Sequence, residues 1–507
     1  MTLPLSPGDR RLVRNTALVI LGLTALRLVA AAWTPLTFDE AYYWLWSKHL
    51  AGGYYDHPPM VALVIRTGTM IAGDTELGVR LVAVLLALPM SYWIFRTASI
   101  LFGGMRVAAS AALLINVTLI AAVGTLIVTP DAPLMVASSL VLFCLAKLLE
   151  SERGLWWLAV GAAVGAALLS KYTALFFGPA ILIWLLVTPR QRRWLVTPWP
   201  YLGGLVAAAL FLPVILWNAD HQWVSFLKQV TGRAEISQFH PGYLAELIPT
   251  QFVFATPLVF ILGAMGLYAL IRYKTGALAA RALINSTFWT IALYFVWHSL
   301  HARVEANWFA PVYPPFVIAA AIAAQLVPWE RHAQRLADFC LRWAAPVGIA
   351  LFAGLIVQAN TGVLTGFGRD ATVRSVGVGW RALAGEIEAV RARAGATCLL
   401  VPDYGTTSWL IFYMPPGTCV VQPVQRIRWV NMGEPDAAKL AGPLLYVDEL
   451  RPWESPYLKE HFGQVERLAE LPRKRGPLVI ETYGLDLLRV PKGDVIDHSP
   501  PPELAPR

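Results

Sequence analysis

Long apolar runs recur over the first two thirds of the chain and constrain its fold more than any other feature. About eleven of them approach the roughly 20 residues that a helix needs to cross the hydrocarbon core of a membrane. Apolar residues make up 57% of the 507 residues and charged residues 14%, against about 25% charged residues in an average soluble protein. The sequence therefore predicts an all-α integral membrane protein in residues 1–360. The expected spans are 15–33, 79–97, 105–127, 132–149, 155–170, 173–188, 200–218, 250–271, 283–300, 306–327 and 341–358.

Basic residues in the short loops predict how these spans are oriented. Arginines and lysines such as Arg10, Arg96, Arg190 and Arg331 fall on one side of the membrane if every run crosses once. Positively charged loops stay in the cytoplasm. The N-terminus is therefore expected in the cytoplasm, with a long first loop (34–78) and everything after about residue 360 on the opposite side of the membrane. An N-terminal signal peptide is the alternative for the first run, but its length favours an uncleaved helix.

The net charge of +9 does not indicate nucleic-acid binding, because the basic residues follow the membrane topology. The loops contain no glycine-rich phosphate-binding motif before a helix, so no ATP or nucleotide sugar is expected as a direct substrate. We expect chemistry on the outer face, where the unusual polar clusters lie.

The composition changes after about residue 370. Short apolar strands at 397–401, 418–421, 444–447 and 478–482 alternate with helical stretches, which predicts a small periplasmic α/β domain over residues 361–495. Cys398 and Cys419 each lie near the start of an expected strand. They could form a disulfide in an oxidising compartment or remain two thiols. Residues 496–507 are rich in proline and are expected to be a disordered tail.

The first loop holds the most unusual stretch, residues 37–60. Asp39, Glu40, Asp56 and His57 lie there among aromatic side chains. A carboxylate at the membrane boundary can act as a general base, and paired acids such as Asp39 and Glu40 could hold a divalent cation, Mg²⁺ or Mn²⁺. The structural alternative is that these acids face water or cap a helix. The intervening tyrosines and tryptophans predict an amphipathic helix lying on the interface.

Other polar residues lie at the outer ends of spans. Asp131 offers a third carboxylate, although an N-capping role explains it almost as well. Lys171 and Tyr172 interrupt an apolar stretch, and the lysine could bind phosphate or extend to lipid headgroups. Arg27 lies inside the first span and is expected to pair with an outer carboxylate.

Two outer loops add cations beside aromatic residues. Arg233 lies in the first of these loops, and His301 and Arg303 lie in the second. Such groups suit a lipid-linked phosphate carrying a sugar. Binding of anionic headgroups at the membrane surface explains each of them at least as well.

The order of several short motifs over residues 15–330 resembles a known family. The motifs are Phe-Asp-Glu-Ala-Tyr-Tyr-Trp from residue 38, Asp-His-Pro-Pro from 56, Thr-Pro-Asp from 129, Ser-Lys-Tyr from 170, Trp-Asn from 217 and Asn-Trp from 307. Together they resemble bacterial GT-C glycosyltransferases of the protein O-mannosyltransferase and aminoarabinose transferase type, glycosyltransferase families 39 and 83. The Asp-His-Pro-Pro form also resembles a branch that includes rhizobial galacturonic acid transferases.

The resemblance implies an inverting transfer from a polyprenyl-phosphate sugar on the periplasmic side. Asp39 matches the family's catalytic aspartate, with Glu40 beside it. Asp56 and His57 match a motif that is often Glu-Lys, so His57 replaces a phosphate-contacting lysine. Asp131 matches an acid at the mouth of the cavity. Tyr172 belongs to the same donor-binding set, and Lys171, Arg233, His301 and Arg303 are expected as phosphate contacts.

The predicted function is therefore transfer of a hexose or pentose to lipid A, lipopolysaccharide, another glycan or a protein. The expected partners are this lipid-linked donor, the acceptor and membrane lipids. No cofactor is implied with certainty, and a metal requirement stays open. A transporter or flippase is the alternative. It would place more charges or broken helices near the middle of the membrane, with a repeat between halves, and no such repeat is present in the sequence.

Overall fold

The structure is a computed structural model that describes residues 6–233, 239–363, 371–450 and 455–499. Its contacts divide the chain into two compact units. The first unit comprises residues 1–31 and 57–353, and the second comprises residues 32–56 and 354–507. The predicted first loop, 34–78, is thus shared between the units, and its segment 32–56 packs with the C-terminal part of the chain. Each unit is described by itself.

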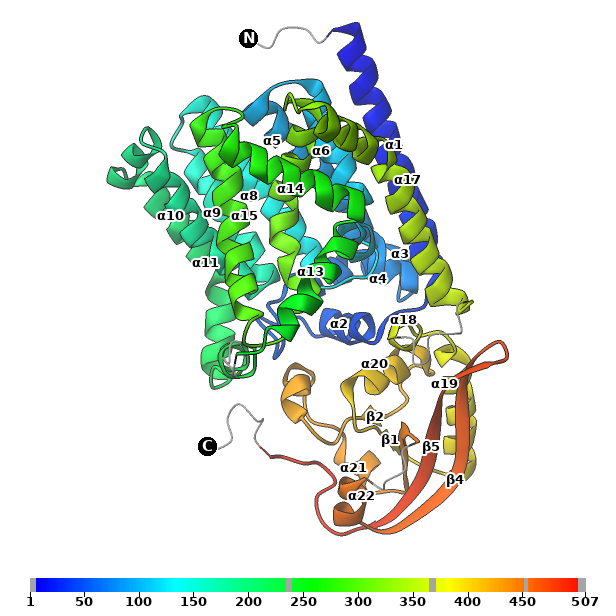
Figure 1. Cartoon of the computed structure of the whole chain (residues 1–507). Coiled ribbons are helices and arrows are strands. Elements are labelled where there is room, and N and C mark those ends of the chain that lie inside the picture. The colour runs from blue at the N-terminus through cyan, green and yellow to red at the C-terminus, as the bar shows by residue number, and fades with distance from the viewer. Residues whose placement is uncertain (1–5, 234–238, 364–370, 451–454, 500–507) are drawn as a thin grey trace. The chain divides into compact units, whose positions relative to one another are not determined.

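The first unit is helical throughout its described residues (Figure 1). The N-terminal helix α1 and the later helix α17 each extend a few residues into the second unit. The α-helices are α1 (Pro7–Trp33), α3 (Met60–Ala72), α4 (Glu76–Leu85), α5 (Ala87–Phe102), α6 (Met105–Val117), α7 (Leu119–Gly124), α8 (Asp131–Ser151), α9 (Trp156–Ser170), α10 (Phe177–Val187), α11 (Trp199–Asp220), α12 (Val224–Leu227), α13 (Gly242–Phe254), α14 (Pro257–Arg272), α15 (Leu278–His298), α16 (Tyr313–Gln325) and α17 (Arg331–Thr361). Shorter turns are η1 (Tyr172–Phe176), η2 (Gln191–Val196), η3 (Lys228–Arg233) and η4 (Ala306–Val312).

Among the described residues, six helices are long and apolar enough to cross a membrane, and a bent pair could make a seventh. Shorter apolar helices include α3, α6, α9 and the η1–α10 segment. The prediction of a multi-span helical membrane protein is confirmed. Helix length and composition alone identify fewer spans than the eleven that we predicted.

Small residues let the helices approach closely. Helix α9 packs against both α8 and α11 (Figure 1). A Cβ at Gly161 would overlap the carbonyl oxygen of Gly203, and a Cβ at Gly266 would overlap that of Ala319. Close backbone approach at small residues is a main source of helix association where lipid removes the hydrophobic driving force.

The break between α6 and α7 is hydrogen-bonded to the break between α13 and α14. Helices α13 and α14 meet at an angle of 105°, and Thr256 at this break has a positive φ of 64°. Its hydroxyl donates to the carbonyl oxygen of Val117 at 2.8 Å and accepts from the N–H of Leu119 at 3.2 Å. These two residues flank Thr118, where α6 ends and α7 begins. The Thr256 hydroxyl therefore satisfies two polar backbone groups at the α6–α7 break, as a membrane interior requires.

The second unit combines helix α2 with a mixed sheet near the end of the chain. The sheet order is β2-β1-β3-β5-β4, with β1 parallel to β2 and β3, and β5 antiparallel to β3 and β4. Helix α19 packs on β4, which forms a long hairpin with β5 (Figure 1). The elements are α2 (Phe38–Lys48), α18 (Ala371–Ser375), α19 (Trp380–Ala394), β1 (Cys398–Leu400), α20 (Tyr404–Tyr413), β2 (Val420–Val421), η5 (Arg426–Met432), α21 (Ala437–Leu440), β3 (Leu444–Glu449), α22 (Pro456–His461), β4 (Phe462–Arg475) and β5 (Leu478–Pro491).

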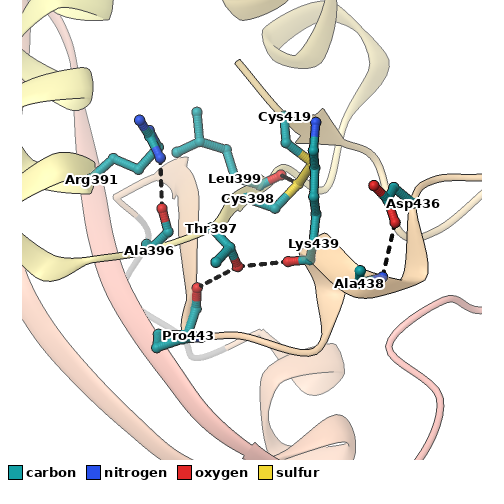
Figure 2. The surroundings of a disulfide bond; sticks show 10 residues. All are labelled: Arg391, Ala396, Thr397, Cys398, Leu399, Cys419, Asp436, Ala438, Lys439 and Pro443. Atoms are coloured by element: carbon teal, nitrogen blue, oxygen red, sulfur yellow. Dashed lines mark hydrogen bonds between the residues drawn. A yellow bond between two sulfur atoms is a disulfide. The ribbon is translucent and has the colours of Figure 1, made fainter. Parts of the chain in front are cut away.

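A disulfide joins Cys398 on β1 to Cys419 just before β2, and Figure 2 shows it beside the loop that leads to β3. The Thr397 hydroxyl lies 2.6 Å from the carbonyl oxygen of Lys439 and 3.1 Å from that of Pro443. Of the two states that the sequence left open for these cysteines, the structure has the disulfide. In the segment predicted as a tail, Ile496 is buried and Asp497 donates its N–H to Pro423; residues 500–507 lie outside the described residues.

Candidate functional site

Helix α2 places the first two acidic residues of the predicted loop. Thr37 is its N-cap and forms a capping box with Glu40. The Glu40 carboxylate accepts from the Thr37 N–H at 2.9 Å and from its hydroxyl at 3.1 Å. Reciprocal bonds of this kind fix the first turn of a helix. Glu40, predicted as a second catalytic or metal-binding acid, is thus buried in a helix cap.

Asp39 lies on α2 beside α20. Its carboxylate is partly buried and accepts a hydrogen bond from the Tyr404 hydroxyl at 3.1 Å. The pKa of Asp39 is raised from 3.8 to about 6, chiefly by burial; the charges of Asp56 and Glu40 add to this shift, while the Tyr404 hydrogen bond and the charge of Arg428 oppose it. A carboxylate with such a pKa is ionised at neutral pH yet can accept a proton, which suits a general base.

Asp56 is held by a residue from the C-terminal part of the chain. The Arg428 Nη1 atom lies 3.0 Å and 2.8 Å from the two carboxylate oxygens of Asp56. The Tyr42 hydroxyl donates to the same carboxylate at 3.1 Å. The guanidinium of Arg428 also lies over the rings of Tyr404, at 4.5 Å, and Tyr55, at 5.2 Å. Arg428 therefore links the Asp56 carboxylate to the tyrosine that contacts Asp39.

The aromatic side chains of α2 correct one expectation. We predicted a helix whose tyrosines and tryptophans lie on the membrane interface, but Tyr42 and Trp46 are almost completely buried. Tyr42 contacts the rings of Tyr404 and Trp429 edge-on or tilted, and Trp46 stacks on Tyr54. These rings surround the Asp39 and Asp56 carboxylates with apolar surface, which is the origin of the raised pKa of Asp39.

A second polar cluster lies within the first unit. Lys171, directly after α9, donates to Asp131 Oδ1 at 2.7 Å. Asn307, in η4, donates to Asp131 Oδ2 at 2.6 Å. Asp131 and Lys171 are both buried, and such an ion pair is costly to break. The alternative prediction, that Asp131 is the N-cap of a helix, is wrong. Pro130 is the N-cap of α8 and makes no side-chain hydrogen bond.

The other residues that we predicted to contact the donor are bonded to partners outside the Asp131–Lys171 ion pair. The Tyr172 hydroxyl hydrogen-bonds to Ser225 at 2.7 Å. Arg303 pairs with Glu246 at 2.5 Å in an exposed position. His301 bonds through Nδ1 to the carbonyl oxygen of Trp297, and His57 is buried in the first unit. The side chain of Arg233 lies outside the described residues.

Arg27 has a different partner from the one expected. Its guanidinium donates to the Asn116 side chain at 3.0 Å and to the Asn116 carbonyl oxygen at 2.6 Å. The prediction of an outer carboxylate is wrong, because an amide and a backbone carbonyl on α6 meet the same need for acceptors inside the first unit.

A divalent cation fits this arrangement poorly. In the part of the chain that the structure describes, no three histidine, cysteine, aspartate or glutamate side chains come together. Cations such as Mg²⁺ and Mn²⁺ prefer several oxygen ligands, and the Glu40 carboxylate is already engaged by the helix cap. Asp39 is the remaining member of the predicted pair, and we derive no step through a metal.

Sequence reasoning missed Tyr404 and Arg428. Both belong to the domain that we expected to stand apart, so neither was considered beside the first loop. The only local signal is an arginine among apolar residues, Ile427 and Trp429, which is typical of many domain surfaces. The contact with Asp56 spans 372 positions of sequence and follows from tertiary packing.

Comparisons with known proteins agree with this fold. Residues 56–217 match the family described as dolichyl-phosphate-mannose-protein mannosyltransferase, and this segment contains Asp56, His57, Asp131, Lys171 and Tyr172. Over this segment the chain is therefore similar to a family of membrane glycosyltransferases, and the resemblance predicted from its motifs is confirmed.

The chain is also similar to two individual proteins. Over 313 residues the chain is 27% identical to the lipid A galacturonosyltransferase RgtD of Rhizobium johnstonii, a match over 61% of this chain and 65% of that protein. The fold is similar to that of ArnT from Cupriavidus metallidurans bound to undecaprenyl phosphate, with a TM-score of 0.65, 15% identity and coverage of 92% and 97% of the two chains. The apo form of that protein gives a TM-score of 0.63 at the same identity, covering 94% of this chain and 98% of that chain.

Proposed function

We propose that the protein transfers a sugar from a polyprenyl-phosphate donor to a hydroxyl group of an acceptor in the bacterial cell envelope. The family match and the undecaprenyl phosphate named for the ArnT structure support the donor class. The activity named for RgtD makes lipid A the first acceptor to test. A different lipopolysaccharide sugar, another glycan or a protein would fit the same chemistry.

The observation that carries this proposal is the environment of Asp39. Its carboxylate lies among aromatic rings with a pKa raised to about 6 and a hydrogen bond from Tyr404. A base of this strength can take the proton from an acceptor hydroxyl as its oxygen attacks the anomeric carbon. The new C–O bond forms on the face opposite the phosphate, the glycosidic C–O bond breaks, and the polyprenyl phosphate leaves with the bonding electrons.

The donor phosphate needs cations or hydrogen-bond donors as its charge develops. Lys171 uses one of its N–H groups for Asp131, and an ammonium group has three. We therefore retain Lys171 as the first candidate for a phosphate contact. His57, Asp131, Tyr172, Arg233, His301 and Arg303 remain candidates for the donor-binding set. For Asp56 we propose a positioning role, through its ion pair with Arg428.

We further propose the inner membrane as the location, with the N-terminus in the cytoplasm and the disulfide-bonded sheet in the periplasm. The basic loops support this orientation, and a disulfide is stable in the oxidising periplasm but rare in the cytosol. The eleven-span topology belongs to the same proposal, with the shorter apolar helices as additional crossings.

The test is transfer of radiolabelled sugar from a polyprenyl-phosphate donor in membranes that contain the full chain. Covalent labelling of lipid A or another envelope acceptor is expected with the wild-type protein and not with Asp39→Asn. Mass spectrometry of envelope lipids and glycans from a deletion strain would identify the missing sugar and its acceptor. Full activity of Asp39→Asn would contradict the proposed role, and movement of the donor across the membrane without covalent transfer would favour a flippase.

A further inference from the structure

A cavity of about 540 Å³ lies in the first unit where several helices end or begin. Its wall includes the C-terminal ends of α5 and α8, the segment after α10 and the first turn of α15. None of the residues with a proposed part in sugar transfer lines it. It opens among the basic loops that separate the spans.

Polar groups in this cavity are ready to bind an anion. Thr188 is only 3% exposed. Its hydroxyl is buried and has no hydrogen-bond partner among the described residues. Helix α15 is 21 residues long, and Ala277 at its N-cap provides no side-chain bond. The first N–H groups of a helix carry a partial positive charge and bind phosphate groups readily. Ala277 to Ala280 line the cavity together with Thr188.

The charged side chains of the wall are Glu150, Glu152 and Arg190, and further cations outside the wall pair with the two carboxylates. Glu152 is bound by Arg190 at 2.5 Å and by Arg193 at 3.0 Å, and Glu150 is paired with Lys147. The two carboxylates are thus matched by three cations. An anion here would meet the excess positive charge of the arginines as well as the helix N-terminus.

Apart from Gln191, the remaining wall is apolar. Ile100, Leu101 and Leu149 form part of the lining, at the ends of helices that are long and apolar enough to cross a membrane. A free phosphate would leave this surface without a partner, whereas a phospholipid has an anionic phosphodiester joined to glycerol and acyl chains. Basic pockets between membrane helices are known to bind anionic headgroups.

We propose that this cavity binds the phosphodiester headgroup of an anionic phospholipid. The Thr188 hydroxyl and the N-terminus of α15 donate to the phosphate, Arg190 contributes charge at the rim, and the glycerol and upper acyl groups cover the apolar wall. This lipid site is separate from the groups proposed for sugar transfer, so it can be tested whether or not that reaction is the right one.

The experiment measures lipid binding to the delipidated full-length protein by native mass spectrometry. The probes are phosphatidylglycerol, phosphatidylcholine and inorganic phosphate. Wild-type protein is expected to bind phosphatidylglycerol best. Thr188→Val and Arg190→Gln should each weaken that binding about tenfold, because each removes a hydrogen bond or charge that acts on an ionised group.

Matched controls separate binding from folding. Thr197→Val changes a threonine on the same loop whose hydroxyl bonds to Trp194, and Arg192→Gln changes an exposed arginine that does not line the cavity. Both should bind phosphatidylglycerol like the wild type. Ala277→Trp, which fills the exposed rim, should also reduce binding. Without lipid, Thr188→Val should melt no lower than the wild type, because a buried hydroxyl without a partner costs stability.

Equal affinity of wild type, Thr188→Val and Arg190→Gln for phosphatidylglycerol would overturn the proposal. So would binding of inorganic phosphate with no binding of phosphatidylglycerol, which would assign the cavity to a soluble anion. Equal binding of phosphatidylcholine would overturn the requirement for an anionic headgroup.

Discussion

Arg428 and Asp56, 372 positions apart in sequence, form an ion pair in which one guanidinium nitrogen contacts both carboxylate oxygens. The side chains are only 15% and 10% exposed, so each charge depends on the other for its solvation. A segment of the predicted catalytic loop is thereby fixed by a residue from the sheet-containing part of the chain.

Arg428→Met is expected to impair both stability and catalysis. Removing one partner of a buried ion pair costs about 3 to 5 kcal/mol, because the other charge is left uncompensated. The positive charge of Arg428 also lowers the pKa of Asp39. Its loss should therefore move the acidic limb of the pH–rate profile to higher pH. Thermal unfolding in detergent and the pH dependence of transfer measure the two effects.

Arg393→Met is the control for this change, since Arg393 is exposed and donates to the Ala389 carbonyl oxygen on its own helix. Arg428→Lys, which keeps the charge, should recover part of the pH shift. An unchanged pH profile in Arg428→Met would exclude the positioning role.

Asp39→Asn is expected to reduce transfer by about 10² to 10⁴-fold, the usual contribution of a general base. In the wild type, activity should fall as pH drops below about 6, because protonation of Asp39 removes the base. Initial rates between pH 5 and 8 measure this limb. Asp74 is an exposed carboxylate in the same predicted loop, and Asp74→Asn should keep wild-type rates. A comparable loss of activity in Asp74→Asn would show that the loss in Asp39→Asn comes from the changed charge of the loop.

The same Asp39→Asn change should stabilise the folded protein near neutral pH. The pKa of Asp39 is raised from 3.8 to about 6 on folding, so the folded state holds the proton more tightly than the unfolded state. Stability then falls as pH rises through this interval, by up to about 3 kcal/mol. Asparagine avoids this cost and can still accept from Tyr404. A higher melting temperature than the wild type is expected at pH 7.5, with little difference at pH 4, and the opposite order would contradict the burial argument.

Lys171→Met should destabilise the first unit, because Asp131 would keep a buried charge after losing its cationic partner, with the Asn307 amide still bonded to it. A loss of about 3 to 5 kcal/mol is expected. The double variant Lys171→Met/Asp131→Leu should recover most of it. Melting temperatures of the single and double variants in detergent measure these changes in stability. Additive losses in the double variant would show that the two side chains act independently.

Reduction of the disulfide should destabilise the sheet. Cys398 and Cys419 are 21 positions apart, and closing a loop of this size contributes about 3 kcal/mol in the chain-entropy account. In the denatured protein, thiol labelling should find two of the four cysteines before reduction and four after it. Cys144→Ser leaves the disulfide intact and serves as the control; labelling of all four without reductant would show that the bond is absent.

The features that could be predicted from the sequence are those that depend on a local pattern of residues. Apolar runs predicted the spans, and the alternating segments predicted β1, β2, β3 and β5, but the charged outer strand β4 carries too little apolar alternation to be found. Asp39 was proposed from the sequence because acids are rare beside aromatic residues at a membrane boundary. Tyr404 and Arg428 were not, because their contacts with Asp39 and Asp56 depend on tertiary packing. The breaks at Thr118 and Thr256 were also missed, since they are stabilised by each other.

The joining of residues 32–56 to the last part of the chain has a consequence for how the protein is made. Asp39 and Tyr404 are 365 positions apart, and a ribosome adds about 5 to 20 residues per second. Asp39 must therefore wait some tens of seconds after its own synthesis before Tyr404 and Arg428 exist. During that interval the nascent chain holds its acidic loop without the partners that shape it. The proposed transferase site is thus among the last features to mature, and a polypeptide released early by a stop codon would carry most of the apolar helices but would lack the residues that surround Asp39.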